Sequence, residues 1–165
     1  MDTPEAPIPG VGEEGIPPCA IHVDEEGDWY HEGNRIIRES ILEVLFEGLR
    51  VGPDGNYLIE WNRTVCALDV ADTVFVVARV DRTRSEDTDQ ESIRLTFRHL
   101  SHGEPLDPTT LRVGKDNVLY CQVRAGRFPA RFSRPAYYQL AEWIQEDAGS
   151  GLFYLELDGH RHAIG

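Results

Sequence analysis

The sequence has few of the features that mark exported, membrane or disulfide-rich proteins. No window approaches the roughly 18 uninterrupted apolar residues that a membrane helix needs, so we expect no membrane span. Residues 1–16 contain no basic residue and no apolar block, which argues against a signal peptide. The three cysteines, Cys19, Cys66 and Cys121, are an odd number at wide spacing. They favour reduced thiols in a cytoplasm over a disulfide framework, with Cys66 and Cys121 expected in the core.

Catalytic motifs are also missing. The chain has no Gly-x-Ser-x-Gly elbow, no glycine-rich phosphate loop and no His-Glu-x-x-His zinc motif. Two histidine pairs, His99 with His102 and His160 with His162, have no carboxylate or cysteine at a matching spacing. Exposed histidines are therefore favoured over a zinc site. We expect no enzyme, no cofactor and no metal, with an enzyme of unrecognised class as the weaker alternative.

Lysine is nearly absent, with one Lys against fifteen Arg, and the net charge of −13 is unevenly spread. Residues 1–34 hold nine acids and no Lys or Arg, whereas residues 92–136 hold eight basic residues against three acids, a net charge of +5. An acidic protein is repelled at long range by nucleic acid and by anionic membranes. We therefore expect neither as a partner. The positive segment can still hold one small anion.

Composition along the chain predicts two tandem halves behind an acidic arm. Residues 1–18 are rich in Pro, Gly and acids and predict a disordered or loosely draped arm. The halves are expected at residues 19–82 and 91–165, with a polar linker or hairpin loop at residues 83–90. Each half predicts an antiparallel sheet with one helix, so the fold class is α+β.

Local patterns set the expected elements. Regular apolar spacing predicts a helix at residues 36–50, with Asn34 as its N-cap. Ser133 caps a second helix, which has Tyr137 on its inner face and ends at the glycines from residue 149. Alternating or continuous apolar runs predict strands at residues 20–23, 28–31, 57–61, 64–68, 74–80, 93–100, 118–124, 128–132 and 152–157.

The two halves can be aligned with each other. Placing Gly27 on Gly126 and reading forward without gaps brings Asn34 onto Ser133, so that cap falls on cap and apolar face on apolar face. Three of the first nineteen aligned positions are identical. We favour an internal duplication. The alternative is that any two strand–helix–strand segments align in this way.

Two ordered stretches resemble a known family. Residues 27–36, Gly-Asp-Trp-Tyr-His-Glu-Gly-Asn-Arg-Ile, resemble the opening of a bacterial family named domain of unknown function 1285. Residues 123–126, Val-Arg-Ala-Gly, and 133–140, Ser-Arg-Pro-Ala-Tyr-Tyr-Gln-Leu, resemble its second signature. The resemblance implies a two-part, duplicated α+β fold whose second half is like a pleckstrin-homology barrel. It also implies a nucleotide-like ligand between the halves and a role in signalling, in a family without an established biochemical activity. The acidic arm and residues 155–165 depart from the family pattern.

Arginines in the second half form the candidate anion site. Arg124, Arg127, Arg131 and Arg134 lie within eleven residues that contain no acid, around a strand that leads into a helix start. Guanidinium groups match phosphate oxygens, and a helix N-terminus favours negative charge. We expect Arg134 and Arg127 to hold the anion, with Arg124 beside them and Arg35, the repeat equivalent of Arg134, approaching from the other half. The alternative is that these arginines pair with acids of the same chain.

Aromatic residues complete the expected ligand-binding set. Trp29 is placed to stack on a base and Tyr137 follows the second helix start, although aromatic residues in such elements also serve as core packing. The sequence thus favours non-enzymatic binding of a small anionic ligand, with a nucleotide among the candidates, at the interface of the halves and in a regulatory role. A protein-interaction module without a small ligand is the alternative.

Overall fold

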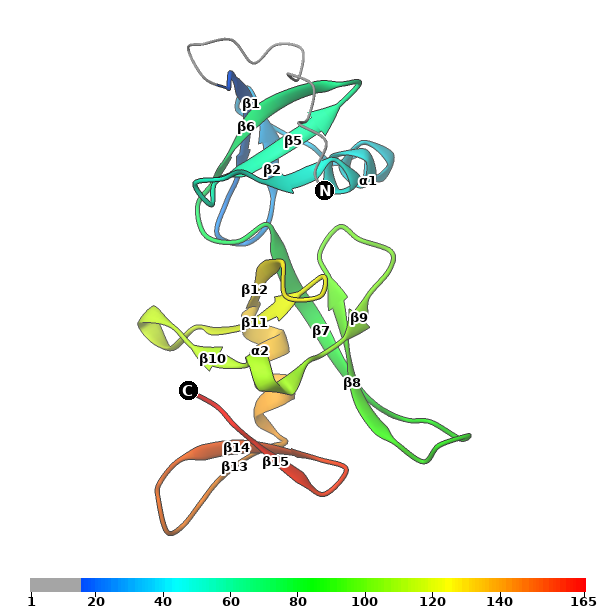
Figure 1. Cartoon of the computed structure of the whole chain (residues 1–165), viewed down its shortest axis with the longest axis vertical. Coiled ribbons are helices and arrows are strands. Elements are labelled where there is room, and N and C mark those ends of the chain that lie inside the picture. The colour runs from blue at the N-terminus through cyan, green and yellow to red at the C-terminus, as the bar shows by residue number, and fades with distance from the viewer. Residues whose placement is uncertain (1–15) are drawn as a thin grey trace, which may run out of the picture. The chain divides into compact units, whose positions relative to one another are not determined.

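The computed structural model describes residues 16–165 and divides the chain into two units, with the boundary between Asp72 and Thr73 (Figure 1). This boundary precedes the end expected for the first half, at residue 82. Most of the expected arm lies outside the described residues. Its last residue, Pro18, already begins a strand, so the predicted end of the arm is wrong.

The first unit is a six-stranded sheet with one helix. Its strands lie in the order β3-β2-β1-β6-β5-β4, and neighbours are antiparallel except β1 and β6, which run parallel. The elements are β1 (Pro18–Val23), β2 (Trp29–His31), β3 (Asn34–Arg35), α1 (Glu39–Glu47), β4 (Leu49–Val51), β5 (Tyr57–Trp61) and β6 (Thr64–Val70).

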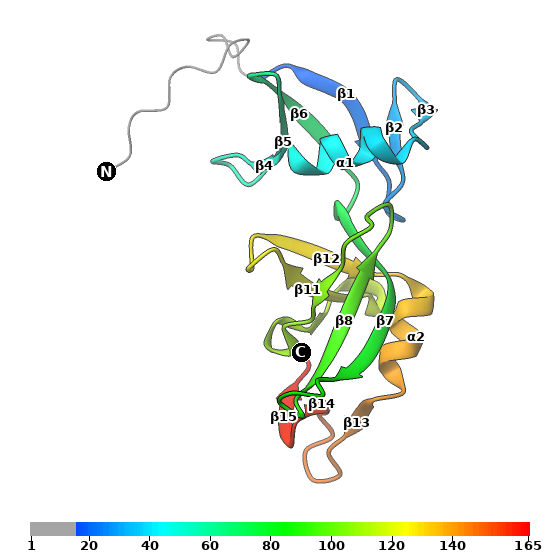
Figure 2. The same cartoon turned by 90° about the vertical axis from the view of Figure 1, so that its right-hand side faces the viewer.

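Helix α1 covers one face of this sheet (Figure 2). Leu42 and Leu45 of α1 are buried, and the ring of Phe46 packs 5.0 Å, centroid to centroid, from the ring of Trp29. Trp29 and its cross-strand partner Val23 are fully buried on the same face. These apolar contacts form the core of the first unit.

Asn34 does not cap the first helix, so that prediction is wrong. Glu32 and Gly33 both have positive φ, +48° and +83°, and form a two-residue turn that sends the chain back as β3, with Asn34 opposite His31. The helix begins only after Arg38, whose side chain makes no capping hydrogen bond. Asn34 is therefore part of a tight hairpin, although its residue type alone favoured a helix start.

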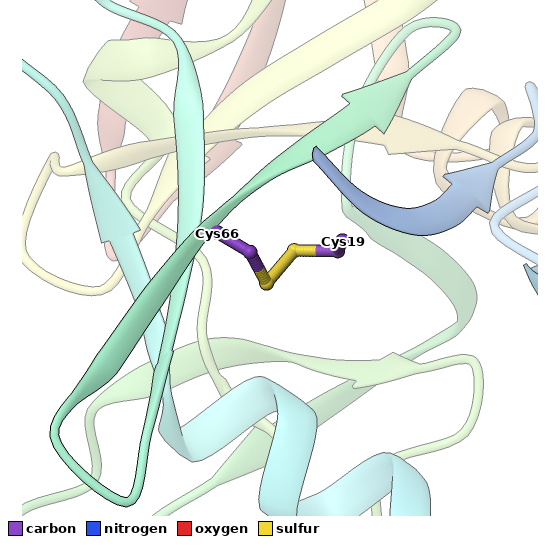
Figure 3. The surroundings of a disulfide bond; sticks show 2 residues. All are labelled: Cys19 and Cys66. Carbon is purple, nitrogen blue, oxygen red and sulfur yellow. A yellow bond between two sulfur atoms is a disulfide. The ribbon is translucent and has the colours of Figure 1, made fainter. Parts of the chain in front are cut away.

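Cys19 and Cys66 form a disulfide, with Cα atoms 4.9 Å apart (Figure 3). The expectation of reduced thiols, with Cys66 as a simple core residue, is wrong for this pair. The physical reason is the parallel pairing of β1 with β6, which brings two cysteines 47 residues apart in sequence side by side. Cys121 is a free, buried thiol, as expected.

The second unit contains a six-stranded sheet in the order β10-β11-β12-β7-β8-β9 and a three-stranded sheet in the order β13-β14-β15. Neighbours are antiparallel except β12 and β7, which run parallel. The elements are β7 (Phe75–Arg84), β8 (Glu91–Phe97), β9 (Glu104–Pro105), the 3₁₀ turn Pro108–Thr110, β10 (Arg112–Val113), the 3₁₀ turn Lys115–Asn117, β11 (Leu119–Val123), β12 (Phe128–Phe132), α2 (Arg134–Ala141), β13 (Ile144–Glu146), β14 (Phe153–Leu157) and β15 (His160–Ala163).

Helix α2 runs beside β7 in the second unit (Figure 2). Ser133 caps it as predicted, because its hydroxyl accepts a hydrogen bond from the N–H of Ala136. Ala136 and Leu140 are fully buried, whereas Tyr137 is 37% exposed. The expected inner face is therefore wrong for Tyr137.

Residues 85–90 form a turn inside the second unit. Strand β7 continues to Arg84 and β8 begins at Glu91, and the N–H of Ser85 donates to the carbonyl of Gln90 across the turn. Of the two alternatives for residues 83–90, the hairpin loop is confirmed and the linker is wrong.

Both units share one order of elements. A hairpin (β1–β2 or β11–β12) leads to a helix, and a meander of three strands follows (β4–β6 or β13–β15). The aligned glycines Gly27 and Gly126 both have positive φ in the hairpin turns, +84° and +82°. The α+β class with two similar halves is consistent with this order. The expectation of purely antiparallel sheets is wrong, because each six-stranded sheet contains one parallel pair.

Candidate functional site

Arg127 and Arg134 lie at opposite ends of β12. The five residues of β12 and Ser133 separate them, and a strand rises about 3.3 Å per residue, so their backbones are on the order of 20 Å apart. The Nε–H of Arg127 donates to the carbonyl of Arg124 at 3.1 Å, which turns its side chain toward the β11–β12 turn. The expected pair is therefore not brought together on one phosphate-sized ion.

Arg124 belongs to the structure of that turn. Its backbone N–H donates to both carboxylate oxygens of Glu104, at 3.3 and 3.1 Å, and its Nε lies 3.8 Å from the same group. Its guanidinium carbon also lies 5.4 Å from the ring centroid of Phe75. For Arg124 the alternative given above, pairing with an acid of the same chain, is confirmed.

The start of α2 has few free hydrogen-bond donors for an anion. The Ser133 hydroxyl accepts a hydrogen bond from the N–H of Ala136, and Pro135 has no N–H. At this helix start Arg134 therefore supplies the first backbone N–H that could bind an anion. The Arg134 side chain is exposed and has no hydrogen bond or ion pair within residues 16–165. Tyr137, one turn on, packs edge-on against Tyr138 at 5.6 Å. This helix start alone is a weak anion site.

The two residues expected from the first half have structural roles there. Nη2 of Arg35 donates at 3.0 Å to Asp28, whose side chain is 8% exposed. Trp29 is fully buried against Phe46, and its indole N–H has no partner in the described part of the chain. Trp29 fills the core and is closed to a ligand, whereas Arg35 is half exposed and balances a buried charge.

Cross-strand register brings three other arginines into one line on the second unit. Arg112 of β10 lies opposite Tyr120 of β11, and Tyr120 lies opposite Arg131 of β12. Arg131 lies beside Val76 of β7, whose carbonyl accepts a 2.9 Å hydrogen bond from the N–H of Arg98. We call Arg112, Arg131 and Arg98 the arginine row.

The arginine row lies on the outer face of the six-stranded sheet. In β12 the buried residues Phe128, Ala130 and Phe132 alternate with Pro129 and Arg131, so Arg131 faces away from the core. Neighbouring strands are about 4.8 Å apart, and one strand lies between successive arginines of the row. The three side chains therefore start at intervals of about 10 Å.

One member of the row is held by an aromatic ring. The guanidinium carbon of Arg112 lies 4.6 Å from the ring centroid of Tyr120, a cation–π contact. Gly114 lies against the same ring, because a Cβ on Gly114 would come within 2.6 Å of Tyr120. Tyr120 is therefore buried under its neighbours and positions the arginine.

The surrounding charge on this face is also positive. Arg79 and Arg94 occupy the same face of β7 and β8, by register with Thr96 and Asp81. Asp81 is the one acid among the described strand residues of this face, and its carboxylate lies 2.9 Å from Nε of Arg79. Five arginines against one acid make a locally positive surface, which attracts anions and is screened by salt.

The sequence contained a signal for this surface. Apart from Glu91 at the start of β8, strands β8–β12 fall within the segment of net charge +5, and alternation in β8 and β12 separates arginines from buried residues. The row itself depends on the register of five strands. Sequence reasoning missed Arg98 and Arg112 because they lie far along the chain from the arginine cluster at residues 124–134.

Two crystal structures of DUF1285 family proteins share this architecture. The protein from Silicibacter pomeroyi DSS-3 is 18% identical, with a TM-score of 0.72 over 99% of this chain and 88% of that one. The chain therefore has the DUF1285 fold. The DUF1285 protein from Shewanella baltica OS155 is 17% identical, with a TM-score of 0.60 over 76% of this chain and 91% of that one. The expected resemblance is thus confirmed at the level of the fold. No protein-family model and no curated protein matches the chain.

Neither helix within residues 16–165 is long and apolar enough to cross a membrane. In the same range, no group of three or more His, Cys, Asp or Glu side chains is placed to hold a metal ion.

Proposed function

We propose that the second unit binds an anionic ligand on its outer sheet face through the arginine row, without catalysis and in a regulatory role. The observation that carries the proposal is the alignment of Arg112, Arg131 and Arg98 across five strands. Guanidinium groups are always charged and match phosphate and carboxylate oxygens with paired N–H donors. Their preset spacing on a rigid sheet reduces the cost of ordering them on binding.

The spacing suits a ligand with more than one anionic group. Side chains that start about 10 Å apart contact successive groups of a polyphosphate or polycarboxylate more readily than one compact ion. The Tyr120 ring is already covered by Arg112 and Gly114, so the row favours the phosphate part of a nucleotide over its base. A ligand between the halves and a pleckstrin-homology-like second half stay predictions.

Titration with sodium tripolyphosphate at low salt tests the proposal. Calorimetry on the full chain should show binding that Arg112→Gln and Arg131→Gln each weaken by about threefold to tenfold, since each removes a charged donor at a partly exposed site. Arg38→Gln, which removes an exposed charge from the first unit, is the matched control and should change nothing.

Arg134→Gln separates this proposal from the site expected from sequence. It should leave tripolyphosphate binding unchanged, because Arg134 lies beyond the end of β12 and outside the row. Loss of binding in Arg134→Gln with no effect of Arg112→Gln or Arg131→Gln would move the site to the start of α2. Absence of binding at about 1 mM tripolyphosphate would remove the function altogether.

A protein-interaction role is favoured by one observation in the first unit. Ile41 and Val44 form an exposed apolar stripe beside the buried face of α1, and Ile37, which precedes the helix, is also exposed. A partner protein that covers this stripe should lose affinity when Ile37 and Ile41 are both replaced by Ser. Binding of tripolyphosphate should be unaffected by the same change.

The cytoplasmic location stays a prediction. Its cysteine argument no longer holds, because disulfides such as Cys19–Cys66 persist mainly in oxidising compartments. Mass spectrometry of alkylated protein from the producing cells will show whether this bond is present there.

A further inference from the structure

The start of β1 pairs irregularly with β6. Between Pro18 and His22 the pairing advances four residues on β1 but two on β6, from Ala67 to Asp69, so the regular ladder is interrupted. Ala20, inside this interruption, has a positive φ of +59°. The N–H of Ala67 donates to the carbonyl of Pro17 at 2.7 Å, and on the other side of β1 the N–H of Glu32 donates to the carbonyl of Ala20 at 3.0 Å.

Burial of side chains also stabilises the start of β1 only weakly. Residues 18–22 are exposed or partly exposed, and the first fully buried residue of β1 is Val23. Val23 and His22 are held separately: Val23 pairs with Val70, and Nδ1 of His22 lies 2.7 Å from the Asp69 carboxylate. The Cys19–Cys66 bond is therefore the covalent link at an irregularly paired and poorly buried strand start, while His22 and Val23 are anchored without it.

Both sulfur-bearing residues are within reach of a reagent. Cys19 and Cys66 are partly exposed, one at the start of β1 and one in the middle of β6 (Figure 3). The remaining cysteine, Cys121, is fully buried in β11. An attacking thiolate needs access to a sulfur atom, so exchange is favoured at the Cys19–Cys66 bond and not at Cys121.

We propose that the Cys19–Cys66 disulfide is a reversible redox latch, which a dithiol reductant opens to release residues 16–21 from β6. A thiolate of the dithiol attacks one sulfur, breaking the Cys–Cys bond and forming a mixed disulfide. The second thiolate of the dithiol then displaces that cysteine. The reductant leaves as a cyclic disulfide, having supplied two electrons, and both cysteines end as thiols after taking up two protons.

Opening the latch has a local consequence. The disulfide spans β1 and β6, which are neighbours in the middle of the six-stranded sheet. On release, Cys66 and Ala67 of β6 lose their neighbours on the β1 side, while β5 stays paired through Leu58 with Ala67 and Ile59 with Cys66. Unpaired strand edges accept other strands, so reduction exposes a pairing edge without unfolding the unit.

Hydrogen exchange of the full chain with and without dithiothreitol tests this latch. Reduction should speed exchange of the amides of residues 19–22 and of Ala67 by about tenfold or more, while amides of α1 and β12 stay within twofold. The variant with both Cys19→Ser and Cys66→Ser should show the fast exchange without reductant and no further response to it.

Three results would overturn the proposal. One is unchanged exchange at residues 19–22 after thiol counting shows complete reduction. Another is a rise across every strand of the first unit, which would make the disulfide a structural bond. The third is a disulfide that dithiothreitol reduces only after denaturant is added, because a latch must open in the folded protein.

Discussion

Arg35→Ala separates a structural role for this arginine from the ligand-binding role that its place in the repeat suggested. Nη2 of Arg35 donates at 3.0 Å to Asp28, and the Asp28 side chain is 8% exposed whereas that of Arg35 is 49% exposed. Removing one partner of a fully buried pair costs about 3–5 kcal/mol, because a charge is left in a poorly solvated place. Since half of the Arg35 side chain is already in water, we discount this to about 2 kcal/mol.

The matched control is the pair Arg50 and Glu60 in the same unit. Their side chains are 53% and 43% exposed, with Nε and Oε2 3.4 Å apart. Arg50→Ala should therefore cost less than about 0.5 kcal/mol. Nη1 of Arg50 also donates to the carbonyls of Glu47 and Leu49, at 3.0 and 2.8 Å, so the difference in cost is a lower bound on the effect of burying the acid.

Urea denaturation followed by circular dichroism and by tryptophan fluorescence measures both costs, with the slope checked for a shared unfolding mechanism. Combining Arg35→Ala with Asp28→Asn should recover part of the loss, because no full charge is then left buried. The reasoning is refuted if Arg35→Ala lowers the free energy of unfolding no more than Arg50→Ala does. Loss of tripolyphosphate binding in Arg35→Ala would contradict it further.

Two further outcomes are expected from the second unit. Burial raises the pKa of Cys121 to about 12, because the thiolate is disfavoured away from water; iodoacetamide at pH 8 should therefore label Cys121 only after denaturant is added, and labelling of the native protein would show that β11 opens. Ser133→Ala removes the hydroxyl that caps α2 and should lower stability by about 1 kcal/mol in urea, without changing the affinity for tripolyphosphate; a full loss of binding would contradict the placement of the site on the sheet.

The elements that the sequence predicted well are those that local pattern alone determines. The predicted strands at residues 57–61 and 128–132 coincide with β5 and β12, and the predicted cap Ser133 is in place. In each case the alternation or the cap lies within a few residues, and tertiary contacts agree with it.

The errors in the fold came from contacts between distant segments. Residues 49–51 and 144–146 continue the apolar pattern of the helices, yet they form β4 and β13 because the following strands pair with them. The Cys19–Cys66 bond depends on a parallel pairing across 47 residues, which spacing cannot reveal. Competition from a two-residue turn displaced the helix start from Asn34.

The candidate site changed for the same reason. Arg124, Arg127 and Arg134 are close in sequence, but an extended strand separates Arg134 from the other two, and Arg124 is paired with Glu104. Arg98, Arg112 and Arg131 are far apart in sequence, and strand register aligns them. Net charge over residues 92–136 pointed to the strands that carry the arginine row, although it could not give the face.

The position of bound tripolyphosphate on the second unit tests the central claim most directly. In nuclear magnetic resonance spectra of the full chain, titration should shift the backbone amide signals of Arg112, Tyr120, Arg131 and the residues around Arg98. All of these shifts should fit one affinity. Amides at Ser133 and Arg134 should stay in place. Shifts concentrated at the start of α2, with the arginine row unmoved, would contradict the claim.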